Sequence, residues 1–192
     1  ILKFKINYIT SFSIKISKFN QMQIPLNETQ LIENWTKIIN YINQNFPSRK
    51  DVLINLYKQF EERMILAPAS TSPIYHNSFP GGYLDHVLRV IDFSEKMYKA
   101  WKAMGMDISG FTLEEVQFCA LNHDLGKMGF TGDNHEYYQP NDNDWEVKKR
   151  NKPFKTNEHI PWMSLADGSL YLLQEYGVPT SWNEWHCIRI HD

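Results

Sequence analysis

The chain has 192 residues, of which 42% are apolar, and this is enough for one hydrophobic core, so we predict a single domain. A formal net charge of −2 and a pI near 6.4 argue against broad, non-specific binding to nucleic acid. No apolar run approaches the roughly 20 residues of a membrane span. The two cysteines lie outside any Cys-x-x-Cys, so we expect free thiols, a cytoplasmic location and no membrane partner.

Residues 1–21 differ from the remainder because lysines interrupt every apolar run. Phe12, Ile14 and Ile16 alternate with polar residues, which indicates a strand. The alternative is that the natural start is Met22 and that the preceding residues are translated upstream sequence. Residues 22–192 are expected to form the domain. The chain stops within a predicted helix, so truncation of the domain at its C-terminus is one interpretation.

Six amphipathic helices are predicted from apolar residues spaced three or four apart. Capping boxes at residues 27–30 and 112–115 begin the first and fourth helices. Gly81-Gly82 leads into the third helix, while Gly126 and Gly177 end the fourth and fifth. The helices are expected over residues 31–46, 52–64, 84–104, 113–126, 165–176 and 182–190, the last one capped by Ser181.

Residues 128–158 have little helical periodicity and are rich in Gly, Asn, Asp, Tyr and Lys. An irregular stretch of this length is unusual in a compact domain and is often functional. We expect a short hairpin within it. The predicted fold class is therefore all-α, with about six helices and one long irregular insertion.

A metal site is indicated by His123-Asp124, which offers a neutral imidazole nitrogen and an anionic carboxylate oxygen. His86, on an earlier predicted helix, offers a third ligand. Gly81-Gly82 before this helix predicts free backbone amides for a phosphate. The alternatives are a hydrogen-bonded core histidine at His86, and a histidine that favours the helix dipole followed by a capping aspartate at His123-Asp124.

The chain resembles the HD superfamily of metal-dependent phosphohydrolases in two sequence motifs, Pro80-Gly81-Gly82-x-x-x-His86 and His123-Asp124-Leu125-Gly126-Lys127. The resemblance extends from about His76 to the C-terminus and implies an HD-type helical bundle. It implies a first divalent ion held by His86, His123 and Asp124. It further implies that His159 and His191 are candidates for a second ion, and that Lys127 and His76 act on the phosphate as catalytic residues, with Arg89 as another candidate.

The family pattern closes with an aspartate on a later helix. Asp192 is one candidate for this ligand, and the alternative is an aspartate beyond residue 192. For His159 the alternative is a surface loop histidine, and for Lys127 it is a helix-end lysine that favours the dipole. His135 is expected to face solvent or substrate.

Nitrogen and oxygen ligands without thiolate suit one or two ions of Mn, Fe, Ni, Co, Zn or Mg. Such an ion lowers the pKa of bound water toward about 7, which predicts hydrolysis of a phosphoester in a phosphorylated small molecule, a nucleotide or an oligonucleotide. Aromatic and basic residues between positions 137 and 154 would suit single-stranded nucleic acid, although a solvated loop is the alternative.

Two other functions are compatible with the same residues. One is a catalytically incomplete, HD-like module that binds a nucleotide or a partner. The other is a metal-dependent oxygenase, which Lys127 and Gly81-Gly82 disfavour because they indicate phosphate.

Overall fold

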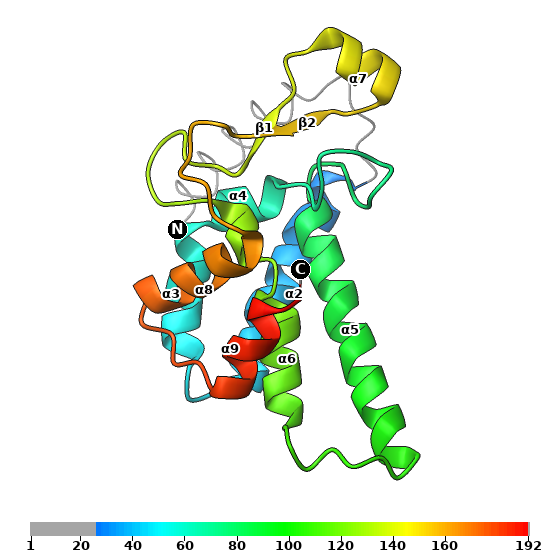
Figure 1. The fold of residues 1–192 in the computed structure, drawn as a ribbon, viewed down its shortest axis with the longest axis vertical. Coiled ribbons are helices and arrows are strands. Elements are labelled where there is room, and N and C mark those ends of the chain that lie inside the picture. The colour runs from blue at the N-terminus through cyan, green and yellow to red at the C-terminus, as the bar shows by residue number, and fades with distance from the viewer. Residues whose placement is uncertain (1–25, 192) are drawn as a thin grey trace.

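The structure is a computed structural model that describes residues 26–191 (Figure 1). The expected strand at residues 12–16 and the assignment of Asp192 as a metal ligand lie outside the described residues.

The described part of the chain is all-α, as predicted, with a single small sheet (Figure 1). None of the helices within residues 26–191 combines the length and the apolar character required to cross a membrane. The helices are α2 (Glu28–Asn45), α3 (Lys50–Gln59), α4 (Glu61–Leu66), α5 (Gly82–Ala103), α6 (Leu113–Asn122), α7 (Asp144–Arg150), α8 (Leu165–Glu175) and α9 (Trp182–Arg189), with a 3₁₀ helix, η1 (Leu125–Met128).

The predicted helix starts are confirmed. Asn27 accepts from the Gln30 amide at the start of α2, and the Gln30 side chain accepts from the Asn27 amide in return. Thr112 begins α6 with the same reciprocal pair, and Ser181 begins α9. These caps satisfy amides that have no partner inside the helix.

One predicted helix is divided in two, and another ends earlier than the periodicity predicted. The helix expected over residues 52–64 is divided into α3 and α4 at Phe60, whose backbone leaves the helical region at φ −109°, ψ 13°. This turn places the Phe60 side chain in the core. The helix expected to reach Gly126 ends at Asn122, because Asp124 adopts φ −101°, ψ 12° and the chain continues as η1.

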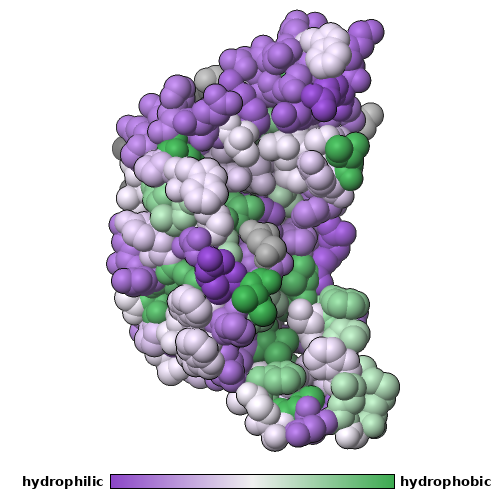
Figure 2. All heavy atoms as spheres, in the orientation of Figure 1, coloured by the Kyte–Doolittle hydropathy of each residue, from purple (hydrophilic) through white to green (hydrophobic). Residues whose placement is uncertain are grey.

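The insertion contains the expected hairpin and also a helix that was not predicted. β1 (Tyr138–Pro140) pairs antiparallel with β2 (Phe154–Thr156), with Tyr138 opposite Thr156. Between them lies α7, which has no buried residue and therefore no apolar stripe from which to predict it. The hairpin and α7 form an arm that projects from the bundle (Figure 1), and most side chains on the face of it that Figure 2 shows are hydrophilic.

The core brings distant segments together. α5 packs against α6 and α2, and α9 packs against α6 and α8. α8 packs closely against η1, where a Cβ atom on Gly126 would lie 2.3 Å from the carbonyl oxygen of Leu165. Glycine at this position therefore allows the contact that fixes the turn after α6. The core side chains with no exposed area include Phe46, Leu53, Leu56, Met64, Phe118 and Leu121.

Candidate metal centre

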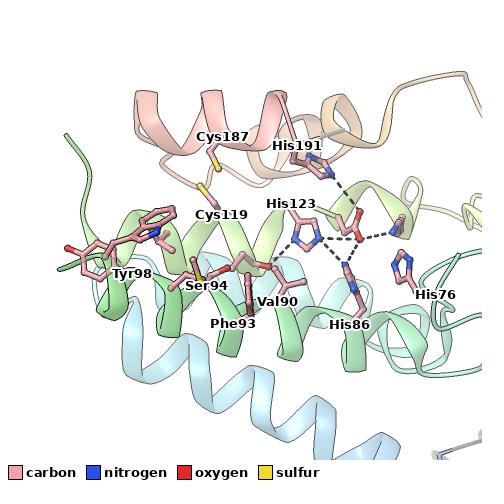
Figure 3. A pocket seen from close by; sticks show the side chains of 16 residues that line it. His76, His86, Val90, Phe93, Ser94, Tyr98, Cys119, His123, Cys187 and His191 are labelled. Carbon is pink, nitrogen blue, oxygen red and sulfur yellow. Dashed lines mark hydrogen bonds and ion pairs between the residues drawn. The ribbon is translucent and has the colours of Figure 1, made fainter. Parts of the chain in front are cut away.

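Three predicted ligands converge where the start of α5 meets the end of α6 (Figure 3). His86 Nε2 lies 3.2 Å from His123 Nε2, and each of these nitrogens lies 3.3 Å from Asp124 Oδ2. Ligand atoms placed about 2.1 Å from one ion are roughly 3.0–3.4 Å apart at octahedral or tetrahedral angles. The nearly equilateral triangle therefore has the dimensions of a site for one divalent ion.

The donor chemistry of His123 also fits a metal ion. Its Nδ1 lies 3.0 Å from the carbonyl oxygen of Ala120, which can only accept, so Nδ1 is the protonated nitrogen. In the neutral ring, Nε2 then directs a lone pair at the anionic oxygen of Asp124. Two acceptors in this position repel each other, and a shared cation removes the repulsion.

Asp124 is anionic although it is only 4% exposed. Burial raises the pKa of this carboxyl group, but the neighbouring imidazoles of His123, His191 and His86 and the charge of Lys127 together hold the pKa well below its usual range. The Lys127 ammonium, on η1, lies 2.6 Å from Asp124 Oδ2 and is itself buried. The centre therefore contains a permanent negative charge with a positive charge beside it.

A serine that the sequence did not single out holds the turn that carries His123 and Asp124. The hydroxyl of Ser169, on α8, donates to the His123 carbonyl oxygen at 2.7 Å and accepts from the Gly126 amide at 2.8 Å. Tyr57 adds a hydrogen bond of 3.0 Å to the Leu121 carbonyl oxygen. A lone hydroxyl within the apolar face of the predicted helix at residues 165–176 was the available signal.

Two further predicted residues lie at the edge of the triangle. The ring centroid of His76 is 4.6 Å from that of His86, and burial lowers the pKa of His76, as do the charges of His86 and Lys127. His191 Nε2 is 3.7 Å from Asp124 Oδ1, and its Nδ1 is 2.7 Å from the Ile188 carbonyl oxygen. The structure thus brings both residues to the centre, and their roles stay predictions.

His159 is not brought to the centre. It is exposed on the loop after β2, where its amide donates to Asn157 Oδ1. Among residues 26–191, the group whose ligand atoms all lie within 4.8 Å of one another consists of His86, His123 and Asp124. We therefore leave His159 out of the ligand set.

The prediction that Gly81-Gly82 presents free amides to a phosphate is wrong. The Gly81 amide donates to Leu66, and the Gly82 amide donates to the Phe79 carbonyl oxygen. Gly81 instead supplies the left-handed backbone, φ 83°, that precedes α5. A Cβ atom on Gly82 would meet the Asn77 carbonyl oxygen at 2.1 Å, so the second glycine permits close chain packing rather than anion binding.

A groove of about 660 Å³ opens from the centre along α5. The three histidines His76, His86 and His191 line one end, and Figure 3 shows Val90, Phe93 and Tyr98 following along the helix. The groove is therefore polar and charged at the centre and largely apolar beyond it.

The arm is less basic than its lysines suggested. Lys148 pairs with Asp144 at 2.7 Å, Arg150 pairs with Glu146 at 3.3 Å, and Lys155 pairs with Asp142 at 2.7 Å. Trp145 of α7 is nevertheless 61% exposed. Because acidic partners compensate these cations locally, the arm offers less charge to a nucleic-acid backbone than the prediction assumed.

Comparison of the chain with models of known protein families, with curated proteins and with solved structures gives no match. The resemblance to the HD superfamily therefore depends on the two sequence motifs that contain His86 and His123-Asp124.

Proposed function

We propose that the protein is a metal-dependent phosphohydrolase with an HD-type helical domain, in which His86, His123 and Asp124 hold a divalent ion. The observation that supports this most directly is the triangle of two imidazole nitrogens and one buried carboxylate oxygen, with sides of 3.2–3.3 Å. When bound, the ion would provide an activated water and a Lewis acid for a phosphoryl oxygen.

Lys127 is the residue best placed to act on a phosphate. Its ammonium lines the groove next to the triangle and is held there by the ion pair with Asp124. A buried positive charge at this point would stabilise negative charge that develops on the phosphoryl oxygens or on the leaving oxygen. Burial and the neighbouring positive charges lower the pKa of His76, which favours the neutral ring, so His76 would act as a proton acceptor beside the phosphate.

A nucleotide is the substrate class that the groove supports. Its volume lies within the usual range for small-ligand pockets, about 300–1,000 Å³. The charged end would bind the phosphate, and the apolar walls, which include the aromatic rings of Tyr98 and Trp101, would accommodate a base.

One observation favours a second candidate, a nucleotide- or partner-binding module without catalysis. The Lys127 ammonium already compensates the buried charge of Asp124, so this carboxylate has a cationic partner without a metal ion. In that case the pair would have a structural role.

Metal content and turnover, measured together, separate the two candidates. Bound Mn and Zn would be determined by elemental mass spectrometry after reconstitution, and hydrolysis would be followed with bis(p-nitrophenyl) phosphate and with nucleoside monophosphates. We expect about one ion per chain, metal-dependent turnover, and loss of both in His123→Ala.

His159→Ala is the matched control, because it removes an exposed histidine outside the triangle and should change neither quantity. Metal without turnover would support the binding module. Absence of metal from the wild type would refute the proposed centre.

A further inference from the structure

The two cysteines of the chain meet at the interface between α6 and α9. Figure 3 shows the sulfur atoms of Cys119 and Cys187 facing each other across this interface. The Cys119 Sγ is also 3.8 Å from the carbonyl oxygen of Glu184, which lies one turn before Cys187 on α9. The thiols are therefore close enough to react with each other after only a small movement of the two helices.

Each cysteine stands four residues before a histidine of the centre. Cys119 precedes His123, the residue that caps α6, in this way, and Cys187, in the last turn of α9, precedes His191, which follows that helix. Residues four apart lie on the same helix face, one turn from each other. The sulfur pair thus lies one turn from the rings of His123 and His191, whose centroids are 5.2 Å apart.

The two thiols differ in their access to solvent. Both cysteines line the groove, but Cys187 is exposed whereas Cys119 is buried, with 8% of its surface exposed. Contact with Cys119 lowers the pKa of Cys187 to about 6, although burial opposes this. An external reagent therefore reaches Cys187 first, and Cys119 is positioned as the second thiol.

We propose that Cys119 and Cys187 form a reversible disulfide on exposure to a low-molecular-weight disulfide, and that this cross-link weakens metal binding at the centre. The Cys187 thiolate attacks one sulfur of oxidised glutathione, forms a mixed disulfide and displaces one glutathione thiolate. Cys119 loses its proton to solvent and attacks the Cys187 sulfur, which displaces the second glutathione. Two protein thiols are oxidised and one small disulfide is reduced to two thiols.

The coupling to the metal, which rests on the proposed function, follows from bond lengths. A disulfide bond is about 2.05 Å long, shorter than any contact between two separate thiols, so its formation draws α6 and α9 together. The movement occurs one turn before His123 and His191. Because displaced supporting groups typically reduce metal affinity by about 10–100-fold, we expect at least a tenfold loss.

The thiol reaction is tested on the full chain by titration with oxidised glutathione, followed by alkylation and intact mass. We expect the wild type to lose both thiols without retaining a glutathione adduct. Cys119→Ala should retain the adduct on Cys187, and Cys187→Ala should react at least tenfold more slowly. A stable adduct on the wild type, or a disulfide between two chains, would overturn the proposal.

The coupling is tested by calorimetric titration of Zn²⁺ into reduced and cross-linked wild type, with the Cys119→Ala/Cys187→Ala double variant as the control. The cross-linked protein should bind Zn²⁺ at least tenfold more weakly than the reduced protein. The double variant should bind Zn²⁺ with the same affinity before and after treatment with oxidant. Equal affinity of the two wild-type forms would overturn the coupling. Absence of Zn²⁺ binding by the reduced protein would refute the proposed metal site itself, and the mass measurement would still decide the thiol reaction.

Discussion

At the scale of single residues, Asp124 governs the centre because it is a buried charge that must be compensated. Lys127 provides that compensation, and the imidazoles of His86 and His123 point at the same oxygen. The lysine therefore has two roles that can be separated: it neutralises the carboxylate, and it presents a positive charge to the groove.

Replacement of Lys127 by Met should lower phosphodiester turnover by about 100-fold or more, because removal of one group that stabilises transition-state charge typically costs 10²–10³ in kcat. Bound metal per chain should stay at the wild-type value, since Lys127 is not a ligand. Steady-state kinetics and elemental mass spectrometry measure the two quantities.

Lys155→Met provides the control for this substitution, because it removes an ammonium that pairs with Asp142 on the arm. It should change neither turnover nor metal content. Wild-type kcat in Lys127→Met would exclude the lysine from the reaction.

Ser169 determines the shape of the turn that presents the ligands. Ser169→Ala should lower the free energy of unfolding by about 1–3 kcal/mol, because it leaves the buried Gly126 amide without its acceptor. Thr36→Ala, which removes an exposed hydroxyl bonded within α2, should cost about 0.5 kcal/mol or less. Urea denaturation compares them, and equal losses would contradict the assigned role of Ser169.

The histidines show what the sequence can and cannot predict. Two short sequence motifs identified His86, His123 and Asp124, and the structure brings their ligand atoms within 4.8 Å of one another. His159 and His191 were both expected to contribute, since each lies downstream of His123. The path of the chain separates them: His191 follows α9, which packs on α6, whereas His159 follows β2 of the arm and stays exposed. Spacing along a sequence contains no such information.

At the scale of helices, a buried ion pair joins α9 to Arg49, the residue that precedes α3. Both guanidinium nitrogens of Arg49 lie 2.9 Å from the Glu184 carboxylate, which is 1% exposed. Arg49 also stacks over the Phe118 ring of α6, with 4.1 Å between the guanidinium carbon and the ring centroid. This contact determines where Cys187 and His191 lie relative to α6.

Glu184→Gln should destabilise the protein by about 3–5 kcal/mol, because it leaves the Arg49 charge buried without its principal partner. Glu114→Gln is the matched control: Glu114 also accepts from Arg49, at 2.8 Å, but its side chain is 48% exposed. An exposed pair of this kind is worth about 1 kcal/mol or less. Thermal and urea denaturation give both values, and similar losses in the two variants would mean that α9 is not anchored by Glu184.

Helix starts were more predictable than helix ends. A capping box is a local interaction of four residues, and those at Asn27 and Thr112 are present as expected. The ends depend on tertiary contacts instead. α6 stops at Asn122, and in the turn that follows, a hydroxyl from α8 bonds the His123 carbonyl oxygen and the Gly126 amide.

At the scale of the whole molecule, the centre joins two helices from separate parts of the chain, so metal binding and folding should be linked. The triangle exists only when α5 and α6 are packed together, and the unfolded chain has no such arrangement. A ligand that binds the folded state alone adds RT ln(1 + [L]/Kd) to the free energy of unfolding.

Addition of Mn²⁺ or Zn²⁺ at 100 times the dissociation constant should therefore stabilise the wild type by about 2.7 kcal/mol. For a chain of this size such a gain raises Tm by roughly 5–10 °C. Differential scanning calorimetry with and without metal measures the shift, and a chelator should reverse it. His123→Ala should lose the shift because one corner of the triangle is removed, while His159→Ala should retain it. An equal shift in both variants would place the bound ion elsewhere on the chain and separate it from the chemistry assigned to His86, His123 and Asp124.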